Sequence, residues 1–274
     1  MAGWLGSWRA GFAALSALAA LLVVTPVWAS DDDPWPEIKA YLFQDREIGG
    51  AGRILRMEAP ELALDAATVP IKVVAGIPQT EDRYIKTIHL VIDKNPSPVA
   101  GIFHMTPESG VASIATRIRV NEYTHVRAIA ETNDGDLFMT TRQIRASGGC
   151  SAPALKDHEA AMTRLGKMKI KPISPIVVGK PSQVQLMISH PNYSGLQMDN
   201  AAGNWIPPHF VEQIDVRYGD RKVMSVEGDI SLSENPSIRF SFIPDESGEL
   251  TVEVKDTEDG VFEETMMIGS GPGA

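Results

Sequence analysis

The chain has 274 residues, of which 43% are apolar, 22% are charged and one is a cysteine, and its formal net charge is −10. This length predicts one or two domains, at roughly 100–200 residues per domain. The acidic excess and the lack of a basic cluster along the sequence argue against nucleic-acid binding. A single cysteine excludes an internal disulfide and a zinc site built on cysteine pairs.

Residues 1–29 predict a secretory signal peptide. Arg9 is the only charge before an apolar run over 12–24, and Val27-Trp28-Ala29 presents small side chains at both positions that a signal peptidase reads. We therefore expect cleavage after Ala29 and a soluble mature protein in the periplasm, an oxidising compartment. A retained membrane anchor is the alternative, but the run is shorter than the roughly 17–25 residues of a spanning helix.

Residues 30–150 predict a β-sandwich domain preceded by a short helix. The helix is expected over 34–43, with Trp35, Ile38 and Leu42 on one face, and is expected to lie across the end of the sandwich. Short pieces rich in β-branched residues then alternate with turn formers at about 8–12-residue spacing, which is typical of a sandwich. The clearest strands are expected over 84–92, 112–120 and 124–132, with a hairpin turn at Asn133-Asp134-Gly135.

Residues 151–168 predict a linker, and residues 169–274 predict a second β-sandwich domain. The linker contains a helical pattern over 152–166, with Leu155, Met162 and Leu165 on one face and Gly166 as the C-cap. The acidic stretch over 256–260 is interpreted as a solvated hairpin turn. Strands are expected over 184–188, 211–218, 222–226, 237–243, 250–254 and 261–268.

Cys150 is the residue with the clearest chemistry. It follows Gly148 and Gly149 directly after the last expected strand of the first domain, and Pro153 follows soon after. Two glycines widen the allowed backbone conformations, so this stretch is expected to be a flexible arm with an exposed thiol. A buried packing cysteine is the alternative, because most free cysteines are buried.

The sequence around this cysteine resembles the sulfur-carrying arm of SoxY, a carrier subunit of thiosulfate oxidation. The resemblance extends through Asn95-Pro96-Ser97-Pro98, and the second half resembles SoxZ through Ile188-Ser189-His190-Pro191 and Ser233-Glu234-Asn235-Pro236. The order of the two halves is similar to the fused SoxYZ-like carriers associated with quinoprotein dehydrogenases. This resemblance implies two immunoglobulin-like sandwiches joined by the linker. It also implies that Cys150 binds a sulfur-containing intermediate covalently and presents it to partner enzymes, without catalysis by the chain itself.

Two other functions stay open. The chain can be a non-covalent docking module of a periplasmic dehydrogenase, which needs no cargo on Cys150. A copper chaperone is the other alternative, because the chain has eleven methionines and an adjacent His104-Met105 pair, and thioether and imidazole ligands suit copper. The histidines lack metal-site spacing and the methionines are scattered, so we assign no cofactor, no metal and no catalytic residue, and no role to His190 or His209.

Overall fold

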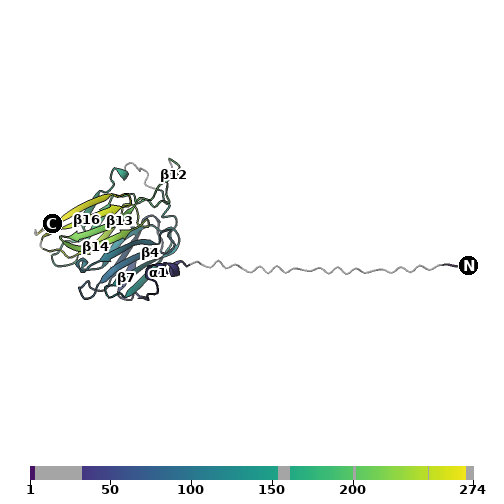
Figure 1. The fold of residues 1–274 in the computed structure, drawn as a ribbon, viewed down its shortest axis with the longest axis horizontal. Helices are drawn as coiled ribbons and strands as arrows, with labels where there is room; N and C mark the ends of the chain where they lie inside the picture. Colours follow the sequence, from purple (N-terminus) through teal and green to yellow (C-terminus); the bar gives the residue numbers. More distant parts are fainter. Residues whose placement is uncertain (4–32, 154–160, 200–201, 246, 270–274) are drawn as a thin grey trace. The chain divides into compact units, whose positions relative to one another are not determined.

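The computed structural model describes residues 1–3, 33–153, 161–199, 202–245 and 247–269. The chain divides into two units, Met1–Asp32 and Asp33–Ala274. The predicted signal peptide lies outside the described residues apart from 1–3. The second unit is built mainly of strands (Figure 1). Within the described ranges, no helix has the length and apolar character needed to cross a membrane.

Strands, together with the helices α1 and η1, make up most of the described part of this unit. The first half contains α1 (Trp35–Phe43), β1 (Ile48–Gly50), β2 (Leu55–Glu58), β3 (Val69–Ala75), β4 (Ile85–Ile92), β5 (Val99–Met105), η1 (Pro107–Ser109), β6 (Ser113–Ile118), β7 (Thr124–Thr132) and β8 (Leu137–Ile144). The second half contains β9 (Met168–Pro172), β10 (Ser182–Ile188), β11 (Met198–Asp199), β12 (Asn204–Trp205), β13 (Val211–Tyr218), β14 (Arg221–Gly228), β15 (Ser237–Phe242), β16 (Gly248–Asp256) and β17 (Val261–Ile268).

The strands form two large sheets, which confirms the predicted all-β, immunoglobulin-like sandwich fold, although the two predicted sandwiches share both sheets. One sheet has the order β1-β8-β7-β4-β5-β14-β13-β16-β17, and the other has the order β2-β3-β6-β15-β10-β9. Strand β10 shows why these segments fold this way, because its residues alternate strictly between buried and half-buried. The inward residues of both sheets, such as Ile88, Phe103 and Phe240, form one apolar core between them.

Both sheets continue from the first half of the chain into the second. In the larger sheet β5 pairs with β14 from Met105↔Met224 to Gly101↔Gly228. In the smaller sheet β6 pairs with β15 at Ala115↔Arg239. Each half thus covers a sheet edge of the other, which would otherwise expose unpaired backbone groups. The domain boundaries at 150 and 169 stay predictions, while the strands join the two halves into a single compact unit.

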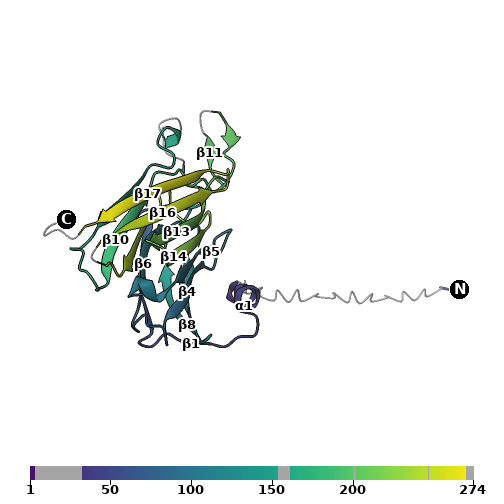
Figure 2. The same ribbon diagram turned by 60° about the vertical axis from the view of Figure 1, so that its left-hand side comes forward.

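The helix α1 covers the outer face of the larger sheet. Trp35, Ile38 and Leu42 pack toward Val91 of β4 and Ile129 of β7, which confirms the predicted apolar face of this helix. Figure 2 shows α1 beside β4 and β8, on the broad side of the sheet. The expected position across the end of the sandwich was therefore wrong. The physical reason is that Val91 of β4, Ile129 of β7 and Leu137 of β8 form a small apolar patch outside the main core, and this patch needs a cover.

The turn between β7 and β8 agrees with its prediction, whereas the end of the linker agrees only in part. Gly135 has φ +95° in the hairpin turn predicted from Asn133-Asp134-Gly135. The predicted linker helix falls largely on residues 154–160, which lie outside the described residues, although Ala161 and Met162 are helical. Gly166 has φ +73°, but the helical residues end at Met162 and the Gly166 N–H donates to Ser189, so Gly166 lies in the turn after the helix and the predicted C-cap was wrong.

Candidate functional site

The segment that carries Cys150 is docked against the first half of the chain. After β8 ends at Ile144, the backbone N–H of Gly148 donates to the carbonyl oxygen of Asn121 at 2.8 Å, and that of Gly149 donates to Val120 at 3.0 Å. Gly148 adopts φ +77°, in the left-handed region that favours glycine. Both glycines of the predicted flexible arm are therefore held by hydrogen bonds in this conformation.

Gly149 lets the arm lie closer to the backbone of Ala66 and Val120 than a residue with a side chain would permit. A Cβ atom at this position would lie 2.1 Å from the carbonyl oxygen of Ala66 and 2.7 Å from that of Val120. These neighbours are backbone atoms, which cannot turn aside as a flexible side chain can. The second glycine thus serves close packing here, in addition to any conformational freedom it gives the arm.

The second half of the chain holds the other side of the same segment. The Ser194 hydroxyl donates to the carbonyl oxygen of Cys150, and the Gln197 side-chain amide donates to that of Ala152 at 3.0 Å. Gln197 also accepts the backbone N–H of Ser194 at 3.2 Å, which orients both side chains. We call the segment 148–152 the docked arm. It contacts Ala66, Val120 and Asn121 on one side, and Ser194 and Gln197 on the other.

The thiol of Cys150 is buried, with 0% of the residue exposed. Burial raises its pKa to about 11, against the opposing effect of the nearby Arg119 guanidinium, while Asp229 raises it further. The expectation of a thiol exposed to solvent is wrong for this conformation. The physical reason is that small glycines allow tight docking as readily as motion, and the sequence of the arm does not reveal its partners elsewhere in the chain.

Arg119 is the charged residue that accompanies the buried thiol. It is 1% exposed, and its Nη1 donates to the carbonyl oxygens of Ile230, at 2.9 Å, and Leu232. Burial lowers its pKa to about 10, which the negative potential of Cys150 and Glu234 partly opposes. A guanidinium with this pKa is still cationic at neutral pH, so the docked arm places the sulfur close to a fixed positive charge. Sequence reasoning missed Arg119, which looked like an ordinary strand residue.

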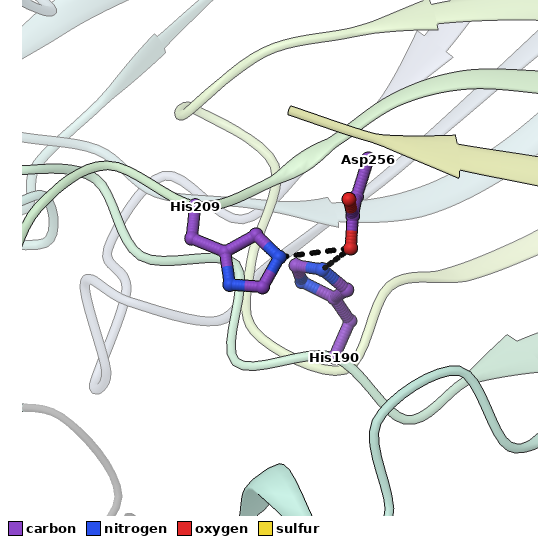
Figure 3. Close-up of side chains that lie close together, drawn as sticks. All are labelled: His190, His209 and Asp256. Carbon is purple, nitrogen blue, oxygen red and sulfur yellow. Dashed lines mark hydrogen bonds and ion pairs between the residues drawn. The ribbon is translucent and has the colours of Figure 1, made fainter. Parts of the chain in front are cut away.

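A second buried cluster consists of His190, His209 and Asp256 (Figure 3). Both His190 and His209 point their Nε2 atoms at Oδ2 of Asp256, at 3.2 and 2.8 Å. Three segments meet here, because His190 follows β10, His209 precedes β13 and Asp256 ends β16. The interpretation of Asp256 as part of a solvated turn was wrong, since it is 2% exposed. Its turn folds back onto histidines that lie 66 and 47 residues away.

The hydrogen bonds of this cluster fit an internal network better than a metal centre. His190 accepts the backbone N–H of Asn192 on Nδ1 at 3.0 Å, so the neutral ring carries its proton on Nε2 and donates it to Asp256. A metal on Nε2 would shift that proton to Nδ1, where the Asn192 N–H already points. Asp256 Oδ1 accepts the backbone N–H groups of Glu258 and Gly260 at 3.0 and 2.8 Å.

The network positions the loop over 190–197 that binds the arm. Next to His190, the side chain of Asn192 donates to the Leu232 carbonyl oxygen at 2.9 Å and accepts the backbone N–H of Val211 at 2.9 Å. Ser194 and Gln197 follow in the same loop. Burial raises the pKa of Asp256, but hydrogen bonds from His209, Gly260, Glu258 and His190 outweigh it and hold that pKa below its usual value.

Acid is expected to destabilise the protein through its buried histidines. Burial lowers the pKa of His190 to about 4, which the Asp256 hydrogen bond only partly opposes, and burial also lowers that of His89 to about 4. The unfolded chain, with histidine near pKa 6.5, therefore binds more protons than the folded chain below that pH. Stability is full above pH 6.5 and decreases as the pH falls toward 4, by up to about 3 kcal/mol for each histidine.

Urea unfolding at pH 7, 5.5 and 4 measures this effect. His190→Gln should lose less unfolding free energy between pH 7 and 4 than the wild type, whatever its stability at pH 7. The control is Gln143→Ala, at an exposed position on β8 that carries no titrating group, and it should keep the wild-type pH dependence. Equal losses in the wild type and His190→Gln would show that His190 is not a buried neutral residue.

The residues of the copper hypothesis do not converge in the described part of the chain. Nε2 of His104 lies 2.6 Å from Oε1 of Glu227, whereas the adjacent Met105 is buried in the core. Met267 is 71% exposed on the edge strand β17. Met105 is thus a core methionine, His104 makes a surface hydrogen bond, and Met267 is a surface methionine.

Comparison with known proteins places these features in a family. Residues 39–150 match the model of SoxY, described as sulfur oxidation protein SoxY, and residues 170–267 match that of SoxZ, described as sulphur oxidation protein SoxZ. The SoxY match ends on Cys150. The search of curated proteins found no match.

Similar solved structures include three kinds of protein. The sulfur carrier protein SoxY from Chlorobium limicola f thiosulfatophilum is 21% identical, with a TM-score of 0.35, and the match covers 41% of this chain and 91% of that one. A superoxide reductase from Ignicoccus hospitalis is 18% identical, with a TM-score of 0.32 and 35% and 82% coverage. Fibronectin(III)-like modules of Clostridium thermocellum CbhA are 10% identical, with a TM-score of 0.23 and 78% and 93% coverage. The two family matches in tandem show that this chain belongs to the SoxY and SoxZ sulfur-oxidation families, with a SoxY domain followed by a SoxZ domain.

Proposed function

We propose that this protein is a carrier in sulfur oxidation that holds a sulfur-containing group covalently on Cys150. The observation that carries the proposal is that the SoxY match ends on the only thiol of the chain. In this proposal Gly148 and Gly149 form the arm that moves the thiol, and the protein catalyses no reaction by itself. A carrier thiol also benefits from the lack of a second cysteine, which would expel the cargo as a disulfide.

The docked arm gives this carrier a resting state that protects the thiol. To react, the arm has to give up the hydrogen bonds of Gly148, Gly149, Ser194 and Gln197, each worth about 0.5–1.5 kcal/mol net. Undocking returns the thiol toward its ordinary pKa, near 8.5, and so restores its nucleophilic thiolate. A partner enzyme that binds the undocked arm supplies the free energy for this change.

The chemistry of attaching the cargo to Cys150 determines what the enzyme that loads it must provide. Joining the Cys150 sulfur to a sulfane sulfur of the cargo forms one S–S bond, releases the thiol proton and removes two electrons. The loading enzyme must therefore be, or deliver electrons to, an electron acceptor.

The compartment and the partners form part of the same proposal. We place the mature protein in the periplasm, after cleavage behind Ala29, because the first 29 residues have the layout of a signal peptide. Its partners would be sulfur-transfer proteins or the proteins of a quinoprotein dehydrogenase system. The resemblance of the two fused halves to carriers of that system supports the second choice.

A non-covalent docking module is the second candidate function. The observation that favours it is the burial of Cys150, together with the pKa of about 11 that makes the docked thiol unreactive. In that case the arm would be a structural clamp between the two halves, and the sulfur would never carry a cargo.

Replacement of Cys150 by serine in the producing cells separates the two functions. A carrier predicts that Cys150→Ser reduces oxidation of reduced sulfur compounds by more than tenfold. The control is Ser151→Ala, which changes an exposed neighbour in the same arm and should leave oxidation unchanged. Equal oxidation by both variants would reject the carrier and favour the docking module.

A further inference from the structure

A basic groove crosses the outer face of the smaller sheet, where the two halves of the chain meet. Its cavity volume is about 1040 Å³. The charged residues that line it, among those the structure describes, are Lys72, Arg117, Arg164, Arg239 and Glu58. Four basic residues against one acidic residue give this groove a sign opposite to the net charge of −10 of the whole chain. A local reversal of this kind attracts an acidic partner.

The strand register aligns basic side chains in one row. Lys72 of β3 pairs with Ala115 of β6, and Ala115 pairs with Arg239 of β15. Arg239 pairs with Gln185 of β10, which pairs with Lys171 of β9. Directly paired residues share a face of a sheet. At about 4.8 Å between strands, the three basic residues of the row are spaced about 10 Å apart.

The small side chain of Ala115 gives the groove its depth between two long basic side chains. Within the described residues, the hydrogen bonds and ion pairs of Arg239 and Arg117 include no carboxylate. Lys72 pairs with Glu58 at 3.5 Å, but Arg239 makes no ion pair among the described residues. Arg117 donates to the carbonyl oxygen of Asn235 at 3.0 Å, while its buried Nε–H has no acceptor in the described part of the chain. A carboxylate that enters beside Arg117 can supply that acceptor after a small rotation of the side chain.

The spacing of the row selects an extended ligand. The backbone positions in the row lie about 10 Å apart, so one small oxyanion can reach two neighbouring side chains at most, whereas an extended segment can contact all three. An extended polyproline II segment rises about 3.1 Å per residue with three residues per turn, so every third side chain repeats at about 9.3 Å on one face. Acidic residues at every third position of such a segment would meet Lys72, Arg239 and Lys171 in order.

We propose that this groove binds an acidic, extended segment of a partner protein, with acidic side chains at every third residue. The groove lies near the arm, because Arg117 is two residues before Arg119, the neighbour of the Cys150 thiol. A partner anchored in the groove is thereby brought close to the arm. This surface does not require Cys150, so it is independent of the proposed carrier chemistry.

The test uses a fluorescein-labelled peptide of four Glu-Pro-Pro repeats and fluorescence anisotropy with the whole protein. A permuted peptide of the same composition, with its four glutamates contiguous, controls for spacing. We expect the repeat peptide to bind at least tenfold more tightly than the permuted peptide, and more weakly as salt increases. The double variant Lys72→Glu/Arg239→Glu should lose at least tenfold in affinity.

Lys86→Glu is the matched control variant, because Lys86 is an exposed lysine on β4 of the other sheet, and it should change the affinity less than twofold. The Cys150→Ser variant should bind the peptide as the wild type does, even if the carrier function fails. The proposal would be overturned if both peptides bound equally, or if a twelve-nucleotide oligothymidine bound as tightly as the repeat peptide. It would also be overturned if thiosulfate at a concentration equal to that of the repeat peptide displaced this peptide. Unchanged affinity in the double variant would overturn it as well.

Discussion

Cys150 in the native protein should react with iodoacetamide at least 100-fold more slowly than in the urea-unfolded protein at the same pH. The first reason is burial, because it raises the pKa of the thiol from 9.0 to about 11 and so leaves roughly 100-fold less thiolate at neutral pH. The second reason is steric, since no part of Cys150 is exposed. Reaction then requires the docked arm to open, and its rate reports the population of the open state.

The double variant Ser194→Ala/Gln197→Ala should speed the native reaction at least tenfold. It removes the two side-chain hydrogen bonds by which the second half holds the arm, and it leaves the thiol itself unchanged. Mass spectrometry of the alkylated Cys150 peptide over time gives both rates. Gln213→Ala, at an exposed position on β13, is the control and should react like the wild type. A native thiol as reactive as the unfolded one would mean that the arm is not docked in solution.

Gly149→Ala should expel the arm from its dock. The added methyl group would lie 2.1 Å from the Ala66 carbonyl oxygen, which is backbone and cannot move without disturbing its neighbours. Overpacking of this kind costs about 1–3 kcal/mol or more, comparable to the few hydrogen bonds that hold the arm. We therefore expect Cys150 of this variant to react with iodoacetamide at least tenfold faster than in the wild type, with a lower unfolding free energy.

The control for this substitution is Gly50→Ala. Gly50 lies on the edge strand β1 and outside the left-handed region, and a Cβ atom added there would meet no heavy atom within 4 Å. Neither the reaction rate nor the stability of this variant should therefore change appreciably. Wild-type reactivity and stability in Gly149→Ala would show that the close contact between Gly149 and Ala66 does not exist in solution.

Local sequence patterns were sufficient to predict most individual strands, because alternation of buried and exposed residues is encoded within each strand. The predicted 124–132 and 211–218 strands coincide with β7 and β13. The pairing of β5 with β14 was not predicted, because it joins residues more than 100 positions apart and neither strand sequence indicates which strand it pairs with. The outer position of α1 was missed for the same reason, since it depends on an apolar patch that Val91, Ile129 and Leu137 form on three different strands.

The candidate site was predictable only in part. The sequence identified Cys150, Gly148 and Gly149, because glycines beside a lone thiol are a local pattern. Their docking depends on Ala66, Ser194 and Gln197, which carry no distinctive local signal. Asp256 was assigned to a solvated turn because its composition is that of a turn, whereas its burial depends on two distant histidines.

The arm, the loop over 190–197 and the histidine–aspartate network act together to hold the Cys150 thiol in its buried position. The His190–Asp256–His209 network anchors the loop, and the loop holds the arm through Ser194 and Gln197. The strength of this hold sets how often the thiol is available, so the same contacts that protect Cys150 also limit its loading. A partner that loads the thiol must therefore bind the open arm more tightly than the protein's own dock does.

The most direct test of the carrier claim is the intact mass of the protein isolated from its own cells during oxidation of a reduced sulfur compound. A carrier predicts a fraction with added mass that maps to the Cys150 peptide and disappears on treatment with a thiol reductant. The Cys150→Ser protein, isolated in the same way, should show no such increment. An unmodified Cys150 throughout active sulfur oxidation would contradict the claim.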